Sequence, residues 1–226
     1  MKDYGVFDIL GPIMIGPSSS HTAGAARLGK IAKEIVGTDF NKVTFYLHGS
    51  FGKTFEGHGT DKALVAGILG MEPSDEKLRE AFEIANSKGI EYDFIEADLG
   101  YQHPNTVKIV FQFDNDEDIY VTGSSIGGGN ILITDINGNH VEFSGDYPTM
   151  LIKYIDQKGV ISRISSILSN NEVNIATMKV IRESNIATMI VETDSAIDKN
   201  VVDTINRLEE IIYIKGINPI ERWLSV

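Results

Sequence analysis

The residues with the most chemical potential stand together in the run GPSSSHT, residues 16–22, which directly precedes an apolar helical pattern. A serine at a helix start accepts hydrogen bonds from the unpaired N–H groups of the first turn. Those N–H groups and the helix dipole also favour a bound anion. Two interpretations stay open: the serines and His21 surround a small anion, or the run is a capped helix start with a solvated histidine.

A second polar group lies in the runs HGSFGKT (48–54) and GHGTDK (57–62). Gly57 and Gly59 flank His58, and glycine lets the backbone turn sharply, which leaves the imidazole accessible. Imidazole titrates near neutral pH and is the usual side chain for moving protons. His58 is therefore either a proton-transfer residue or a loop histidine exposed by accident. The second run is expected to enter a helix capped by Thr60 or Asp61.

A third histidine occurs in His103-Pro104-Asn105, at a predicted turn before a strand. Pro104 fixes the local geometry and restricts His103 to an extended conformation. No metal signature such as HExxH is present, so we expect no metal site in this chain. The glycines 127–129 lack the context of a nucleotide-binding loop and are typical of a tight turn.

The composition excludes several classes of protein. A net charge of −12 argues against nucleic-acid binding, which needs Lys and Arg to neutralise phosphates. The sequence contains no run long enough to span a membrane, and its opening residues lack the features of a signal peptide, so we expect a cytoplasmic protein. The absence of cysteine excludes a thiol nucleophile and thiolate metal sites.

The elements that position these residues are predicted to form an α+β domain over residues 1–145. A short strand-like start leads into a helix whose apolar face ends at Gly37 and consists of Leu28, Ile31, Ala32 and Ile35. Further helices are predicted over 61–69 and 76–86, and strands over 43–48, 106–113 and 119–122. Turn formers in 137–148 place a domain boundary near Gly145.

Residues 147–226 have a more regular pattern. We expect strands over 149–155, 173–182, 186–193 and 211–217, and helices over 160–168 and 198–209. The order strand, helix, strand, strand, helix, strand is the ferredoxin-like βαββαβ arrangement.

The motifs GPSSSHTAGAARLG, HGSFGKTFEGHGTDKA and YQHPNT resemble the beta subunit of the bacterial iron–sulfur-dependent L-serine dehydratases, over essentially the whole chain. Residues 1–145 also resemble the allosteric substrate-binding domain of phosphoglycerate dehydrogenases, and IKYIDQKGVISRISSILSNNEVNIATM resembles the serine-sensing ACT domain of the same enzymes. The resemblance implies a lyase of amino-acid metabolism and gluconeogenesis that converts L-serine to pyruvate and ammonia.

The resemblance also implies a 4Fe–4S cluster held by the cysteines of a partner alpha subunit, which agrees with the absence of cysteine here. An open iron site would act as a Lewis acid on the serine hydroxyl, while a base removes the α proton. His21 and His58 would transfer protons, His103 would position or gate the substrate, and Lys62 is either a carboxylate partner or a solvated lysine. The residues implied to bind the substrate carboxylate are Ser18, Ser19, Ser20 and Thr22.

In the ACT resemblance, Gly159 lies at the strand–helix turn, with an effector at a dimer interface beside it. Asn174 matches an effector-binding asparagine, whereas Asp156 stands where that family has Asn and Tyr154 where it often has His. The effector-binding candidates are therefore Asn174, Asp156 and Gly159. Self-association through residues 147–226 is expected, since such sheets commonly pair.

Two other functions compete with the dehydratase subunit. One is a stand-alone amino-acid-sensing regulatory protein, which would combine an anion site with the ACT domain. The other is an independent hydro-lyase or hydrolase that uses a histidine and a serine, although no GxSxG run supports it. A partner chain that carries cysteines would favour the dehydratase.

Overall fold

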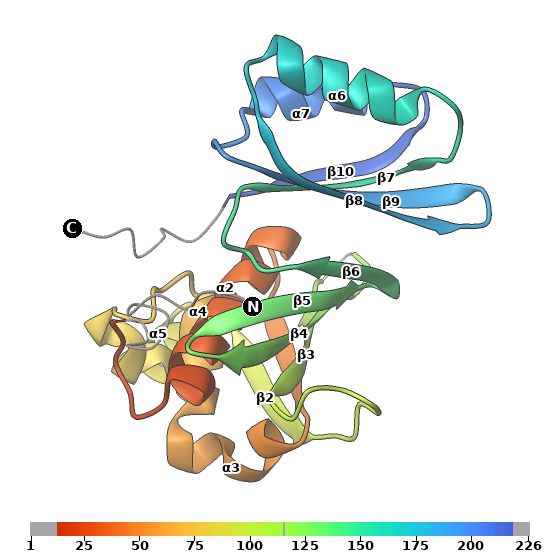
Figure 1. Cartoon of the computed structure of the whole chain (residues 1–226). Coiled ribbons are helices and arrows are strands. Elements are labelled where there is room, and N and C mark those ends of the chain that lie inside the picture. Colours follow the sequence, from red (N-terminus) through yellow and green to blue (C-terminus); the bar gives the residue numbers. More distant parts are fainter. Residues whose placement is uncertain (1–12, 115, 219–226) are drawn as a thin grey trace, which may run out of the picture. The chain divides into compact units, whose positions relative to one another are not determined.

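The computed structural model of the chain describes residues 13–114 and 116–218, which divide into two compact units between Gly138 and Asn139 (Figure 1). The predicted strand-like start at residues 1–12 lies outside the described residues. The expected boundary at Gly145 falls in the turn between the sixth and seventh strands. The α+β architecture predicted from the sequence is confirmed in both units.

The first unit contains five neighbouring strands in the order β2-β1-β3-β4-β5. β1 and β2 run parallel, whereas the pairs β1–β3, β3–β4 and β4–β5 are antiparallel. Alternation along β3 buries Val107, Ile109 and Phe111 beneath the helices, as a sheet with one covered face requires. The strands are β1 (Lys42–Leu47), β2 (Glu91–Glu96), β3 (Thr106–Gln112), β4 (Ile119–Gly127) and β5 (Asn130–Ile136), and the next strand, β6 (Asn139–Phe143), begins the second unit.

The helices of this unit cover one face of the sheet (Figure 1). The predicted apolar face of α2 is buried and Gly37 ends that helix, as expected. None of the helices within the described residues is long and apolar enough to cross a membrane. The helical elements are η1 (Ser19–Gly24, a π-helix), α2 (Ala25–Val36), α3 (Ser50–His58), α4 (Thr60–Ile68), η2 (Glu76–Glu80, a 3₁₀ helix) and α5 (Ala81–Ser87).

The segment that contains His58 differs from the prediction. His58 is the last residue of α3 rather than part of a turn, because Phe51 is fully buried and Gly52 packs against the carbonyl of Leu47, which outweighs the low helix propensity of the glycines. Gly59, in the left-handed conformation at φ 68°, separates α3 from α4. Neither Thr60 nor Asp61 caps α4, so that prediction is wrong.

The helices α2 and α4 approach each other backbone to backbone at two glycines. A Cβ atom added at Gly29 would lie 2.5 Å from the carbonyl oxygen of Leu64, and one added at Gly67 would lie 2.2 Å from that of Ala26. Real Cβ atoms do not tolerate such distances, so the helix pair closes only with glycine at both positions.

The second unit confirms the predicted ferredoxin-like arrangement. Its sheet has the order β10-β7-β9-β8 with every neighbouring pair antiparallel, and α6 and α7 cover one face (Figure 1). The strands predicted over 149–155, 186–193 and 211–217 coincide with the observed ones. The elements are β7 (Thr149–Ile155), α6 (Val160–Asn170), β8 (Ile175–Glu183), β9 (Ile186–Thr193), α7 (Lys199–Asn206) and β10 (Ile211–Ile217).

The glycine contact between α2 and α4 makes a stability prediction. Gly67→Ala should lower the free energy of unfolding by about 1–3 kcal/mol, the usual cost of overpacking, because the new methyl group meets the carbonyl of Ala26. Gly57→Ala is the matched control, because Gly57 is helical and has open space around its Cβ position. Alanine at this position should raise the free energy of unfolding by roughly 0.5–1 kcal/mol. Urea denaturation followed by circular dichroism measures both. Equal midpoints for Gly67→Ala and the wild type would contradict the close packing.

Candidate active site

The serine run forms the start of the first helical segment. Ser18 is the N-cap of η1, and its Oγ accepts a hydrogen bond from the backbone N–H of His21 at 3.1 Å. Ser19 and Ser20 follow in the first turn and are half-buried. A Cβ atom at Gly24 would lie 2.0 Å from Oγ of Ser125 on β4, so this position requires glycine. The sequence therefore fixes where His21 stands relative to the sheet.

The imidazole of His21 is held between two hydroxyl groups. Its Nε2 lies 3.0 Å from Oγ of Ser50, and its Nδ1 lies 3.4 Å from Oγ of Ser18. The ring also meets the edge of Phe51 with 5.3 Å between ring centroids. These contacts leave the half-buried ring few alternative orientations, as a group that transfers a proton at a fixed atom requires.

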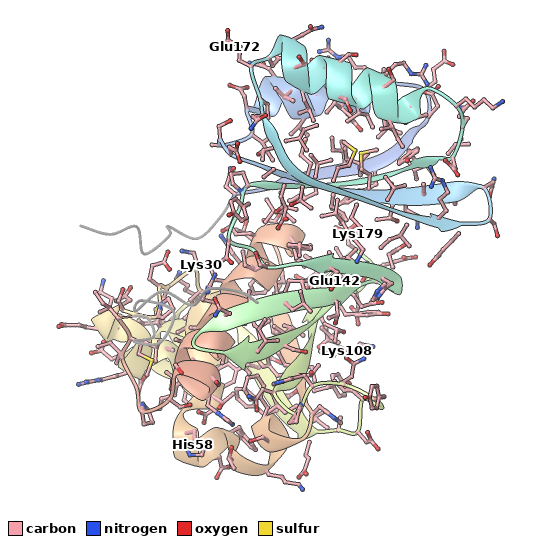
Figure 2. The ribbon with its side chains drawn as sticks, in the orientation of Figure 1. Lys30, His58, Lys108, Glu142, Glu172 and Lys179 are labelled. Atoms are coloured by element: carbon pink, nitrogen blue, oxygen red, sulfur yellow. The ribbon has the colours of Figure 1, made fainter. Side chains whose placement is uncertain are left out.

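A second histidine faces the first. The ring centroids of His21 and His58 are 4.9 Å apart, and Oγ1 of Thr22 donates a hydrogen bond to the carbonyl of His58 at 3.3 Å. His58 is exposed at the end of α3 (Figure 2). Burial and, to a smaller extent, the charge of His58 hold the pKa of His21 below its usual value. Both effects favour the neutral form of His21, which is the form that can accept a proton.

Sequence reasoning missed Ser50, although it stands inside the HGSFGKT run. Ser50 is the first residue of α3 and follows Gly49, whose left-handed φ of 57° and contact with the backbone of Pro104 exclude a side chain. Its backbone N–H donates to the carbonyl of Pro104 at 2.7 Å. One turn of chain thus binds both the imidazole of His21 and the loop that carries His103. The signal in the sequence is a serine in the turn that follows the strand, after His48 and Gly49.

His103 lies apart from the other two candidates. It is exposed, and its Nδ1 accepts from the backbone N–H of Asn105 at 3.1 Å, so the ring caps its own turn. The loop is anchored by His48, whose Nδ1 accepts from the backbone N–H of Leu99 at 3.1 Å. The structure thus joins Ser18, His21, Thr22 and His58 directly, and connects His103 to them through the backbone of its loop.

The effector candidates of the second unit are only partly brought together. Asp156 and Gly159 line a hollow of about 360 Å³, in which Nε of Arg182 lies 2.9 Å from a carboxylate oxygen of Asp156. Asn174 is not part of this lining and donates a hydrogen bond to Asp194. Tyr154 is fully buried and its hydroxyl has no hydrogen-bond partner in the described residues.

Potential metal ligands do not converge in the part of the chain that the structure describes. Residues 13–114 and 116–218 contain no group of three or more His, Asp or Glu side chains arranged around one point. The whole sequence contains no cysteine. The residues present therefore do not fit an iron–sulfur cluster, whose ligands are mainly thiolates.

Comparison with known proteins gives consistent matches in both units. The serine dehydratase beta chain family matches residues 5–135, and the ACT domain family matches residues 149–210. The L-serine dehydratase beta chain of Peptoniphilus asaccharolyticus is 53% identical over 179 residues, which cover 79% of this chain and 81% of that protein.

Two longer proteins match over part of their own length. L-serine dehydratase 1 of Escherichia coli is 30% identical over 79% of this chain, which spans only 45% of that protein. The D-3-phosphoglycerate dehydrogenase of Bacillus subtilis is 30% identical over 70% of this chain and 30% of its own length. Because the first family match extends over more than half of the sequence and the first relative covers most of it, the chain belongs to the serine dehydratase beta chain family and carries an ACT domain.

Proposed function

We propose that the chain is one subunit of an L-serine ammonia-lyase, which converts L-serine to pyruvate and ammonia together with an alpha subunit. The facing pair of His21 and His58, with ring centroids 4.9 Å apart, is the observation that carries the proposal. Removal of an α proton and departure of a hydroxyl group need a base and an acid at one place. The names of the relatives supply the substrate class.

The 4Fe–4S cluster implied by the resemblance belongs, in this proposal, to the alpha subunit. No thiolate is available in this chain, and the described residues offer no alternative set of ligands. A partner also agrees with the length of the E. coli relative, of which this chain spans less than half. When bound to its own subunit, such a cluster would supply Lewis-acid chemistry at the substrate hydroxyl.

The residues of this chain then bind the substrate and move protons. Neutral His21, held at Nε2 by Ser50, accepts the α proton, and the exposed His58 exchanges protons with solvent. The Ser18–Thr22 run lies against the same histidines and binds the amino acid. Loss of the α proton and of the hydroxyl group leaves aminoacrylate, which hydrolyses to pyruvate and ammonia.

The ACT unit has a regulatory role in this proposal. The hollow at Asp156 and Gly159 has a volume suited to a small ligand, and self-association would place it near a second copy. The same hollow also favours the alternative function, a stand-alone amino-acid sensor. The two functions differ in whether the chain, once paired with an alpha subunit, deaminates serine.

Reconstitution tests the subunit assignment. The purified chain should be colourless and inactive, because it has no thiolate to hold a cluster. Addition of the alpha subunit, iron and sulfide should produce both visible absorbance and pyruvate from L-serine. Serine deamination by this chain alone, or none by the reconstituted pair at full iron content, would contradict the proposal.

Substitution of His58 tests its role in proton transfer. His58→Ala in the assembled enzyme should lower kcat by about 10²–10⁴-fold, the usual loss for an acid–base group, with little change in KM for L-serine. The matched control is His140→Ala, since His140 is an exposed histidine in β6 of the second unit. Steady-state kinetics at verified iron content decide the matter. Turnover equal to that of His140→Ala would leave His58 without a catalytic role.

The pKa of His21 provides an independent measurement on this chain alone. Its folded-state pKa is lowered, so the neutral form stabilises the fold above the ordinary value of 6.5, and this contribution is lost as pH falls towards the folded pKa. In His58→Ala the charge that repels protonated His21 is absent, so the titration midpoint of His21 should rise. It should not reach 6.5, since burial is the larger cause of the lowered pKa and remains. An NMR titration of the ring signals measures it. An unchanged midpoint would show that the two rings are not coupled.

A further inference from the structure

A small hollow opens beside His58. It has a volume of about 180 Å³, and its lining includes Thr22, His58, Gly59, Lys62, Leu78 and Arg79. Sites for drug-sized ligands have volumes of roughly 300–1,000 Å³, so this hollow suits only a small molecule. Ser18, Ser19 and Ser20 are not part of its lining, whereas Thr22 of the same run is.

Two cations and no carboxylate are among the described residues that line this hollow. Neither Lys62 nor Arg79 forms an ion pair within residues 13–114 and 116–218, although other cations of the chain do, such as Lys179 with Glu142 (Figure 2) and Arg182 with Asp156. Nζ of Lys62 lies 5.9 Å from the ring centroid of Phe82. In a chain of net charge −12, a hollow lined by two cations and no carboxylate suits an anion.

Asp61 interacts with the charge of Lys62 but does not line the hollow. The carboxylate of Asp61 accepts a hydrogen bond from the backbone N–H of Lys62 at 2.8 Å rather than from its ammonium group. A guanidinium group binds both oxygens of a carboxylate at once, and an ammonium group adds a point charge.

We propose that Arg79 and Lys62 bind the carboxylate of the substrate amino acid in this hollow. The inference deepens the proposed function and rests on it for the identity of the substrate. A carboxylate bound by Lys62 and Arg79 places the rest of a three-carbon amino acid towards Thr22 and His58, which line the same hollow. His21 does not line it, but its ring centroid is 4.9 Å from that of His58. Thr22 of the GPSSSHT run then contributes a hydroxyl group to the site, while Lys62 of α4 and Arg79 of η2 bind the charge of the substrate.

Kinetics of the assembled enzyme test the role of Arg79. Arg79→Ala should raise KM for L-serine roughly 10–100-fold, the equivalent of one lost charge-assisted hydrogen-bonding contact, with kcat changed far less because the carboxylate is held alike in ground and transition states. Arg79→Lys should recover part of the loss. The control is Lys77→Ala, which removes the same charge from an exposed residue of η2 that does not line the hollow.

Binding of acetate to the isolated full-length chain provides a readout that needs no alpha subunit. In the wild type and in Lys77→Ala, acetate at constant ionic strength should shift the NMR signals of His58. The double variant Arg79→Ala, Lys62→Met should lose this shift while keeping its circular dichroism spectrum.

An Arg79→Ala enzyme whose KM equals that of Lys77→Ala overturns the proposal, and so does an acetate shift that persists in the double variant. A reconstituted complex that does not deaminate serine, combined with an acetate shift lost only in the double variant, overturns the proposed function and leaves a carboxylate site in place. The two failures are thus distinguishable.

Discussion

The candidate site depends on the contact between α2 and α4. Gly29 and Gly67 let the two helix backbones approach to a distance that any side chain would prevent. η1, with His21, precedes α2, and α3, with His58, precedes α4. The crossing therefore brings together two segments that are far apart in the sequence, and the hydrogen bond from Thr22 to the carbonyl of His58 joins them at the point of contact.

A second constraint acts through the turn after β1. The backbone of Gly49 packs against that of Pro104. The residues on either side of Gly49 form hydrogen bonds: Ser50 with the ring of His21, and His48 with the backbone N–H of Leu99. A shift of this turn would move His21 and the loop of His103 together. The arrangement explains why polar residues concentrate in a run directly after a buried strand, where the sheet holds them in place.

The second unit could be predicted from the sequence almost residue by residue, because its signals are local. The strands at 149–155, 186–193 and 211–217 are rich in β-branched residues and are bounded by turn formers. In the first unit, α3 contradicts local propensity: its two glycines suggest a turn, and burial of Phe51 decides otherwise. Tertiary packing overrides propensity where a single large side chain fills the core.

The site shows the same division between local and long-range information. Ser18, His21 and His58 were found because each stands in a distinctive run of residues. Ser50 and Arg79 could not be identified from the sequence, because only the fold brings them to their neighbours. Ser50 lies against the ring of His21, and Arg79 lines the hollow beside His58. No residue pattern in η2 distinguishes Arg79 from Lys77.

The unlike surroundings of the two histidines bear on how protons would move in the proposed reaction. His21 is half-buried, touches Phe51 and is bound by hydroxyls at both ring nitrogens, whereas His58 is open to water. Two titratable groups in different environments can hold different protonation states at one pH, which is the condition for one to act as base and the other as acid. The environments differ because η1 is enclosed by the helices and the sheet, while α3 ends at the surface. This difference, which the fold creates, is the reason for which the proposed function gives the α proton to His21 and exchange with solvent to His58.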